Sequence, residues 1–253
     1  MKISVVTVCY NSAATIEHAL KSVTGQDYDS LEYIVVDGLS KDNTLEVVER
    51  YRGGIAHVIS EKDKGIYDAI NKGIRAATGE VVGLLHSDDF LADRSSLSKV
   101  AKVFREHPQA QAVYADLQYV DKDEPEKVIR NWTSGNYRSG DFLKGWMPPH
   151  PTFYARKELF EKYGYYNLDF SISADYELML RMIHKNEIPL AYLPEVLVKM
   201  RVGGKSNVSL KNRLQANRED SLAWKVNGLQ PGMLTRFMKP LSKLKQFRKK
   251  KTS

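Results

Sequence analysis

Four short apolar segments alternate with four amphipathic segments over residues 3–104, and no other feature constrains the fold of this chain as strongly. The apolar segments are rich in β-branched residues, as buried strands are. The amphipathic segments carry apolar residues three and four positions apart, which is the spacing of helices that pack on a sheet. This alternation is typical of βαβ units. It predicts an α/β fold with a mostly parallel central sheet flanked by helices, with strands at residues 3–8, 33–36, 56–59 and 81–85 and helices at residues 16–23, 43–51, 66–78 and 97–104.

The second half of the chain breaks this alternation. Residues 121–150 are rich in turn-forming glycine and proline. The other segments predict short strands near residues 112–115, 152–154, 190–193 and 196–202 and helices near 175–185 and 208–226. There is no internal repeat, and no linker precedes residue 231. We therefore expect one domain over residues 1–230, in which residues 111–230 build onto residues 1–110, followed by a tail over residues 231–253.

The tail carries the net positive charge. The chain has 38 Lys and Arg residues against 31 Asp and Glu residues, and eight basic residues without an acidic one lie between positions 236 and 251. Without these eight, 30 basic residues face 31 acidic ones, so the body is near neutrality, unlike a typical nucleic-acid-binding domain. Apolar residues at helical spacing accompany the basic ones, which favours a helix that binds anionic lipid; the alternative is a solvated basic tail. These apolar residues are Phe237, Leu241, Leu244 and Phe247.

The chain contains one cysteine, Cys9, which excludes an intramolecular disulfide and a cysteine-based zinc site. No histidine-based constellation accompanies Cys9, so it is expected in the core. The first residues enter an apolar run without a small-residue cleavage site, and we expect no signal peptide. No apolar run approaches the ~18–20 residues of a membrane span. Membrane contact is therefore expected only from the tail.

Polar residues follow the predicted parallel strands, at the edge where such sheets bind ligands. The strongest feature is the pair Asp88–Asp89, because adjacent carboxylates at a strand end suit Mg²⁺ or Mn²⁺ bound together with phosphate oxygens. The alternative is a helix cap or a turn. Asp37 precedes a glycine at another strand end, where it can accept hydrogen bonds from a nucleoside or simply form a turn.

Three positions in the second half are further candidates. Asp175 begins a predicted helix whose N-terminus favours an ionised carboxylate, so it is a candidate general base; the alternative is a plain N-cap. His150 lies between prolines that could present its imidazole to a ligand, although a lone loop histidine is usually incidental. Arg201 and Lys205 flank a glycine pair that could close over a diphosphate or form a surface turn. No dinucleotide-binding or phosphate-loop glycine motif is present.

Taken together, these segments resemble the family 2 inverting glycosyltransferases with the GT-A fold. The resemblance covers about residues 1–205 and is most specific in the first 90 residues. The segment 63–69 resembles the branch that builds bacterial exopolysaccharide and O-antigen repeat units, including enzymes of the colanic-acid type, on a polyprenyl diphosphate carrier. The matching segments are residues 4–11, 35–44, 63–74, 78–80, 87–89, 150–153 and 174–181.

The resemblance implies a role for each matching position. Asp37 would contact the nucleotide base, Asp88 the ribose or donor sugar, and Asp175 would be the base. Asp89 would bind Mg²⁺ or Mn²⁺. Ser87 stands where the family's Asp-x-Asp metal motif has its first Asp, so the metal would rely on one carboxylate and the diphosphate. The other positions implied at the donor are Thr7, Cys9, Asn11, Asp63, Lys64, Asp68, Arg201 and Lys205, and His150 is implied on the acceptor side.

The implied function is metal-dependent, inverting transfer of a single sugar from a nucleotide-diphospho-sugar to an acceptor hydroxyl. Residues 1–110 would bind the nucleotide sugar and residues 111–230 the acceptor. The acceptor would be a polyprenyl-diphosphate-linked glycan, and the protein would be cytoplasmic, peripheral on the inner face of the cytoplasmic membrane. The family's processive polymerases carry a Gln-x-x-Arg-Trp motif and membrane spans, which this chain lacks. Two alternatives are a nucleotidyltransferase that makes a nucleotide sugar, and a non-catalytic module that binds sugar nucleotides at a membrane surface.

Overall fold

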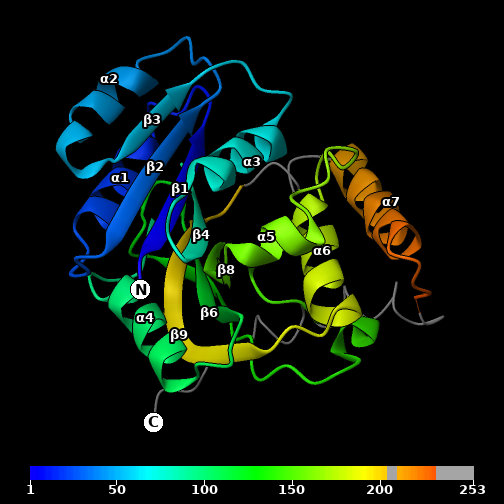
Figure 1. Cartoon of the computed structure of the whole chain (residues 1–253). Coiled ribbons are helices and arrows are strands. Elements are labelled where there is room, and N and C mark those ends of the chain that lie inside the picture. Colours follow the sequence, from blue (N-terminus) through cyan, green and yellow to red (C-terminus); the bar gives the residue numbers. More distant parts are fainter. Residues whose placement is uncertain (204–209, 232–253) are drawn as a thin grey trace.

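The computed structural model describes residues 1–203 and 210–231, and its first half has the predicted alternation of strands and helices (Figure 1). β1 pairs in parallel with β2 and β4, and β2 pairs in parallel with β3. The prediction of βαβ units is therefore confirmed. The elements are β1 (Ile3–Cys9), α1 (Ile16–Thr24), β2 (Leu31–Asp37), α2 (Thr44–Glu49), η1 (Arg52–Gly54), β3 (His57–Ser60), α3 (Ile66–Ala76) and β4 (Val81–His86).

The second half extends the same sheet, and its strands run in both directions. The strand order is β3-β2-β1-β4-β8-β6-β9-β5, and β7 also pairs with β6. β8 runs antiparallel between β4 and β6, whereas β6 and β9 are parallel. The elements are β5 (Phe90–Leu91), α4 (Ser96–Glu106), β6 (Ala112–Val120), β7 (Val128–Trp132), η2 (Asp141–Lys144), η3 (His150–Thr152), β8 (Tyr154–Arg156), α5 (Glu158–Tyr163), α6 (Ala174–Met179), the π-helical turn η4 (Leu180–Lys185), β9 (Leu190–Arg201) and α7 (Leu210–Val226).

Helices cover both faces of the sheet and divide the core into two clusters. In Figure 1, α1, α2 and α4 lie on one side of the strands, and α3, α5 and α6 lie on the other. Along β1, Val5 packs in the first cluster, whereas Val6 and Val8 pack in the second. Strands that are buried on both faces need apolar residues at consecutive positions, which explains the uninterrupted apolar runs of the sequence.

A glycine allows the two halves of the sheet to join. A Cβ atom at Gly83 on β4 would lie 2.1 Å from Cε1 of the Tyr154 ring on β8. Only a residue without a side chain permits this approach, because real Cβ contacts are essentially never that short. Gly83 therefore lets β8 pack beside β4, and the loop that precedes β8 is thereby held near the end of β4.

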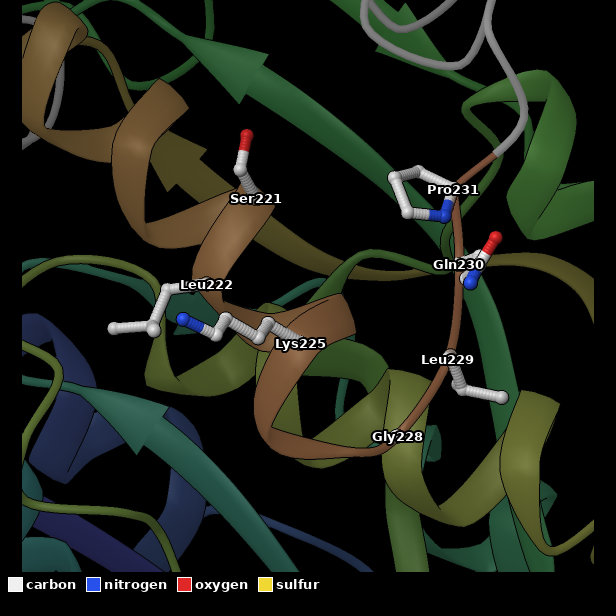
Figure 2. Close-up of a pocket in the computed structure, with 7 residues that line it drawn as sticks. All are labelled: Ser221, Leu222, Lys225, Gly228, Leu229, Gln230 and Pro231. Carbon is white, nitrogen blue, oxygen red and sulfur yellow. The ribbon is translucent and has the colours of Figure 1, made fainter.

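α7 closes the described part of the chain on the side of α6 (Figure 1). None of the helices in residues 1–203 and 210–231 is both long and apolar enough to cross a membrane. The predicted positions Val208, Ser209 and Lys205, and the tail beyond residue 231, lie outside the described residues. The chain reaches residue 231 beside a surface hollow that contains no candidate site residue (Figure 2), and this hollow is lined by Ser221, Leu222, Lys225, Gly228, Leu229, Gln230 and Pro231.

Candidate functional site

The register of the parallel strands brings four strand ends to one edge of the sheet. Cys9 lies opposite Asp37, Val8 lies opposite His86, and Asp37 lies opposite Ser60. The residues that follow these strands are therefore neighbours, although they are far apart in the sequence. This edge is where an open α/β sheet binds its ligand.

Asp37 organises the first part of this edge. Its carboxylate is fully buried and accepts hydrogen bonds from the Ser40 amide at 3.1 Å, the Ser40 hydroxyl at 2.5 Å and the Ser60 hydroxyl at 2.8 Å. Ser40 Oγ in turn accepts from the Asn11 amide, and Asn11 Oδ1 accepts from the Lys41 amide, both at 2.8 Å. The structure thus joins two predicted donor residues, Asn11 and Asp37, through one loop.

Asp63 lies against the same loop. A Cβ atom at Gly38 would stand 2.3 Å from Asp63 Oδ2, so the carboxylate packs on the bare backbone beside Asp37. Asp63 Oδ1 accepts from the Gly65 amide at 2.8 Å, and Asp68 Oδ2 accepts from the Lys64 amide at 3.0 Å. These bonds order the turn into α3, and they place all three predicted residues of this segment at the loop edge.

Thr7 and Cys9 face the interior instead. Thr7 Oγ1 accepts from the buried Tyr33 hydroxyl at 3.0 Å. The Cys9 thiol contacts the Val36 carbonyl at 3.7 Å, and burial, reinforced by the Asp37 carboxylate, raises the pKa of this thiol. Both side chains belong to the packing of β1 against β2, which is the core position that the isolated cysteine predicts for Cys9.

Asp89 is a fully buried carboxylate, and one of its oxygens has no hydrogen-bond partner in the described part of the chain. Its Oδ1 accepts from the Arg201 amide at 3.2 Å, whereas no hydrogen-bond donor among the described residues reaches Oδ2. Burial raises the pKa of Asp89 well above its usual range, Asp88 adds to this effect, and Arg201 opposes it. The Arg201 guanidinium donates to the Asp88 carbonyl and contacts His18 Nδ1, both at 2.5 Å.

These residues fit a divalent cation only in part. The unpaired Asp89 oxygen is a hard donor of the kind that Mg²⁺ and Mn²⁺ favour, and a cation would supply the partner that it lacks. Within residues 1–203 and 210–231, no group of three His, Cys, Asp or Glu side chains could hold a metal. Asp89 would therefore need further ligands from a bound diphosphate and water. The presence of Ser87, where the family's motif has its first Asp, leads to the same expectation.

Asp175 belongs to a chain of hydrogen-bonding groups that leads back to β4. It lies in the first turn of α6, and its Oδ2 is 3.1 Å from His150 Nδ1. His150 Nε2 is 2.9 Å from Nε2 of His86, the last residue of β4. Tyr67 OH donates to the Ile172 carbonyl at 2.6 Å and lies 3.5 Å from Asp175 Oδ1. Asp175 and His150, predicted separately, are thus direct partners.

The charges of both candidate carboxylates act on one side chain of β6. Burial raises the pKa of Tyr119, the guanidinium of Arg130 opposes this shift, and the charges of both Asp89 and Asp175 add to it. Arg130 stacks 3.9 Å from the centre of the Tyr119 ring. Tyr119 is therefore within electrostatic reach of both carboxylates.

The segment before Asp175 is held by a residue from α7. Glu219, which is 3% exposed, accepts hydrogen bonds from the backbone amides of residues 171, 172 and 173 at 2.8–3.0 Å. Burial alone would raise the pKa of Glu219, but hydrogen bonds from Ser171 and Gln215 and from the backbone outweigh it and lower the pKa. Glu219 thereby fixes the start of α6.

Sequence reasoning noted His86 only as one of the polar residues that follow a predicted strand, and it assigned no role to His86, Tyr119 or Glu219. The signal for His86 is its position directly after the strand predicted at residues 81–85 and three positions before Asp89. Tyr119 lies in β6, which was predicted to end at residue 115 but continues to Val120. Glu219 lies in a polar helix whose sequence pattern does not indicate which residues it contacts. Lys205, predicted beside Arg201, is outside the described residues.

Comparisons with known proteins identify the family and the fold. The model of the family "Glycosyl transferase family 2" matches residues 4–165, which is more than half of the chain. A "PGL/p-HBAD biosynthesis glycosyltransferase" of Mycobacterium bovis BCG is 28% identical over 214 residues, covering 81% of this chain and 78% of that protein. An uncharacterized glycosyltransferase of Mycobacterium tuberculosis, MT1564, is 33% identical over 181 residues, covering 71% of this chain and 68% of that protein.

Solved structures share the fold at lower identity. A mannosyltransferase from Pyrobaculum calidifontis, PcManGT, in complex with GDP-Man and Mn²⁺, has a TM-score of 0.67 at 21% identity, covering 96% of this chain and 73% of that one. S. aureus TarS 1-349 in complex with UDP-GlcNAc has a TM-score of 0.68 at 21% identity, and the match covers 88% of this chain but only 66% of that one. The chain belongs to glycosyl transferase family 2 and is a glycosyltransferase with the GT-A fold.

Proposed function

We propose that this glycosyltransferase transfers a single sugar from a nucleotide-diphospho-sugar to an acceptor hydroxyl with inversion at the anomeric carbon. The observation that carries the proposal is the hydrogen-bonded chain from Asp175 through His150 to His86, which ties the candidate base to the end of β4, three residues before Asp89. In this proposal Asp89 faces the diphosphate of the donor, and Asp175 faces the hydroxyl of the acceptor. Two solved structures of the same fold contain GDP-Man and UDP-GlcNAc, which supports a donor of this class.

The reaction requires a base and a means to stabilise the leaving group. Asp175 takes the proton of the acceptor hydroxyl while the acceptor oxygen bonds to the anomeric carbon. The bond from that carbon to the diphosphate oxygen breaks at the same time, and its electron pair leaves with the diphosphate. A bound Mg²⁺ or Mn²⁺ would neutralise this charge. Asp89 would hold the cation, and Arg201, which is ordered against Asp88, would add positive charge nearby.

The acceptor is proposed to be a lipid-linked glycan of bacterial surface polysaccharide synthesis, a polyprenyl diphosphate being the expected carrier. The basic, amphipathic tail supports this, because it would hold the enzyme on the anionic inner face of the cytoplasmic membrane. α7, the described helix nearest the tail, exposes three apolar residues that extend such a surface: Leu214, Leu222 and Val226. Glycosyltransferase relatives make the nucleotidyltransferase alternative untenable; a non-catalytic module is the alternative that the experiment addresses.

The test uses the purified full chain with Mg²⁺ or Mn²⁺ and a panel of nucleotide sugars that includes UDP-GlcNAc and GDP-mannose. Protection from thermal unfolding identifies the donor, and transfer to a lipid-linked acceptor is then measured for Asp175→Asn. This substitution keeps the shape and removes the basicity, so transfer should fall by roughly 10²–10⁴ while donor protection remains.

Asp169→Asn is the matched control, because Asp169 is exposed in the loop that leads to α6. It should transfer sugar as the wild type does. Transfer by Asp175→Asn within about twofold of the wild type would place the base elsewhere. A wild-type protein that is protected by a nucleotide sugar but never transfers it would favour the binding module.

A further inference from the structure

Two histidines link the candidate base to the end of β4. They come from separate elements, His86 from the end of β4 and His150 from η3, and they join Asp175 at the start of α6. The distances, 3.1 Å from Asp175 Oδ2 to His150 Nδ1 and 2.9 Å between the two Nε2 atoms, are those of hydrogen bonds. A general base does not require such a chain, so its presence calls for an explanation.

The chemistry of the three groups assigns the protons. An ionised carboxylate can only accept hydrogen bonds, so His150 must donate from Nδ1 to Asp175. A neutral His150 ring then carries no proton on Nε2, which must accept from His86 Nε2. The network therefore selects one tautomer for each ring, Nδ1–H for His150 and Nε2–H for His86.

We propose that His150 and His86 are positioning residues for Asp175. This inference rests on the proposed function, in which Asp175 is the base. His150 holds Oδ2 and thereby fixes the orientation of the carboxylate that takes the acceptor proton. His86 holds the other side of the His150 ring and ties it to the strand that leads to Asp88 and Asp89. Neither histidine touches the reacting atoms.

A neutral donor is the appropriate partner for a base. A cationic neighbour would stabilise the carboxylate and weaken its affinity for the proton, whereas a neutral imidazole orients it at a smaller cost in basicity. The 2.9 Å contact between the two Nε2 atoms needs a proton on only one of them, which His86 supplies when it donates from Nε2 to His150.

The backbone around His150 is also fixed. Two residues later, the buried Thr152 hydroxyl lies 2.9 Å from the Pro149 carbonyl and 3.1 Å from the Ala115 carbonyl, and it accepts from the Ala115 amide at 3.1 Å. Prolines on both sides of His150 restrict the chain further. The ring is thus anchored to β6 at its backbone and to β4 at its Nε2 atom.

The first test reads the tautomers without any activity. The full chain, with ¹⁵N-labelled histidine, is examined by NMR at pH 7.5, and each histidine is assigned by substitution. We expect the Nδ1–H form at His150 and the Nε2–H form at His86. The Nε2–H form at His150 would overturn the inference, and this result would be readable even if the protein had no transferase activity.

The second test separates positioning from folding. UDP-GlcNAc and GDP-mannose are the donors used, and kcat and the donor KM are measured for His150→Ala and His150→Asn. We expect His150→Ala to lower kcat by up to about 100-fold with the donor KM within twofold, because a misplaced catalytic group costs about that much. His150→Asn should recover part of kcat, because its amide can still donate to Asp175.

His184→Phe is the matched control, because His184 is a half-buried histidine that stacks on Phe142 and contacts Trp224 edge-to-face. It should keep the wild-type kcat. A His150→Ala kcat within twofold of the wild type would overturn the inference, as would equal losses for the alanine and asparagine variants. If His150→Ala does not fold, His86→Phe takes its place, with a smaller loss of kcat expected. If the enzyme turns over neither donor, the proposal of these two donors is wrong. The inference on the histidines is then tested by the NMR assignment of their tautomers alone.

Discussion

Replacing Glu219 by glutamine should loosen the start of α6, and the structure allows the size of the effect to be worked out. Oε2 accepts from the Ile172 amide at 2.9 Å and from the Ser173 amide at 2.8 Å, and Oε1 accepts from Ser171 and Gln215. In Glu219→Gln, an NH₂ group replaces one of these oxygens and faces at least two donors. Each donor left without an acceptor costs about 1–3 kcal/mol, which gives about 2–6 kcal/mol.

Thermal unfolding measures this loss. For a domain of this size, about 2–4 °C corresponds to each kcal/mol, so the midpoint should fall by at least about 4 °C at pH 7.5. The pKa of Glu219 is lowered in the folded state, so its stabilisation is present above the unfolded pKa of about 4.3 and is lost as pH falls through the folded value. The difference between variant and wild type should therefore shrink below about pH 4.

The control is Glu49→Gln, because Glu49 is exposed at the end of α2 and its charge change is the same. This variant should unfold within about 1 °C of the wild type. The same shift in both variants would refute the reasoning, since it would reflect net charge alone. Because residues 171–173 lead directly into Asp175, Glu219→Gln should also slow transfer while thermal protection by the donor remains.

Three further predictions follow from single features. Donor binding measured by calorimetry should require Mg²⁺ or Mn²⁺ and be lost in Asp89→Ala; equal affinity with and without chelator would contradict this. Tyr154→Phe should unfold at or above the wild-type temperature, because the buried Tyr154 hydroxyl has no hydrogen-bond partner among the described residues, and a clear loss of stability would reveal a missed partner. The intact chain should cosediment with anionic but not neutral vesicles and be released only partly by salt, since each basic residue contributes about 1 kcal/mol. Truncation after Gly232 should leave a donor-binding domain in the supernatant, and pelleting as strong as that of the full chain would place the anchor in the folded body.

Local periodicity predicted the first half of the fold well, because each strand and helix there is built from adjacent residues. The exceptions are residues at the ends of short helices. Leu45 and Ile66, which belong to the apolar positions of the helices predicted at residues 43–51 and 66–78, are 36% and 39% exposed. α2 has only six residues, of which Val47 and Val48 face the sheet, and Ile66 is the first residue of α3. A helix as short as α2 does not define a face as a longer repeat does, and the first residue of α3 precedes the turns that pack on the sheet.

The second half could not be predicted to the same extent, because its strands depend on distant partners. Residues 190–201 form one strand instead of two, and pairing with β6 tolerates the interruption near Pro194 through a shift of register after Ala115. β5 and β7, which lay in segments predicted as turns or connections, exist only through their pairing with β9 and β6.

The candidate site shows the same division. Asp37, Asp89 and Asp175 were identifiable one by one, since each follows a strand or starts a helix. Their partners were not, because hydrogen bonds such as those of His86 and Glu219 join segments that are remote in the sequence, and no local pattern encodes such distances.

The place of β8 in the sheet has a consequence for synthesis of the protein. β1 to β4 leave the ribosome first and can form a parallel sheet on their own, but β4 then presents an open edge of unpaired backbone groups. That edge is covered only after β8 (Tyr154–Arg156) has been synthesised and the Tyr154 ring has packed against Gly83. Until then the nascent chain carries a template for pairing with another strand, so conditions that slow elongation before residue 154 should favour aggregation. The same topology makes any division of the gene between β4 and β8 unfavourable, because both fragments would expose strand edges that the intact chain buries.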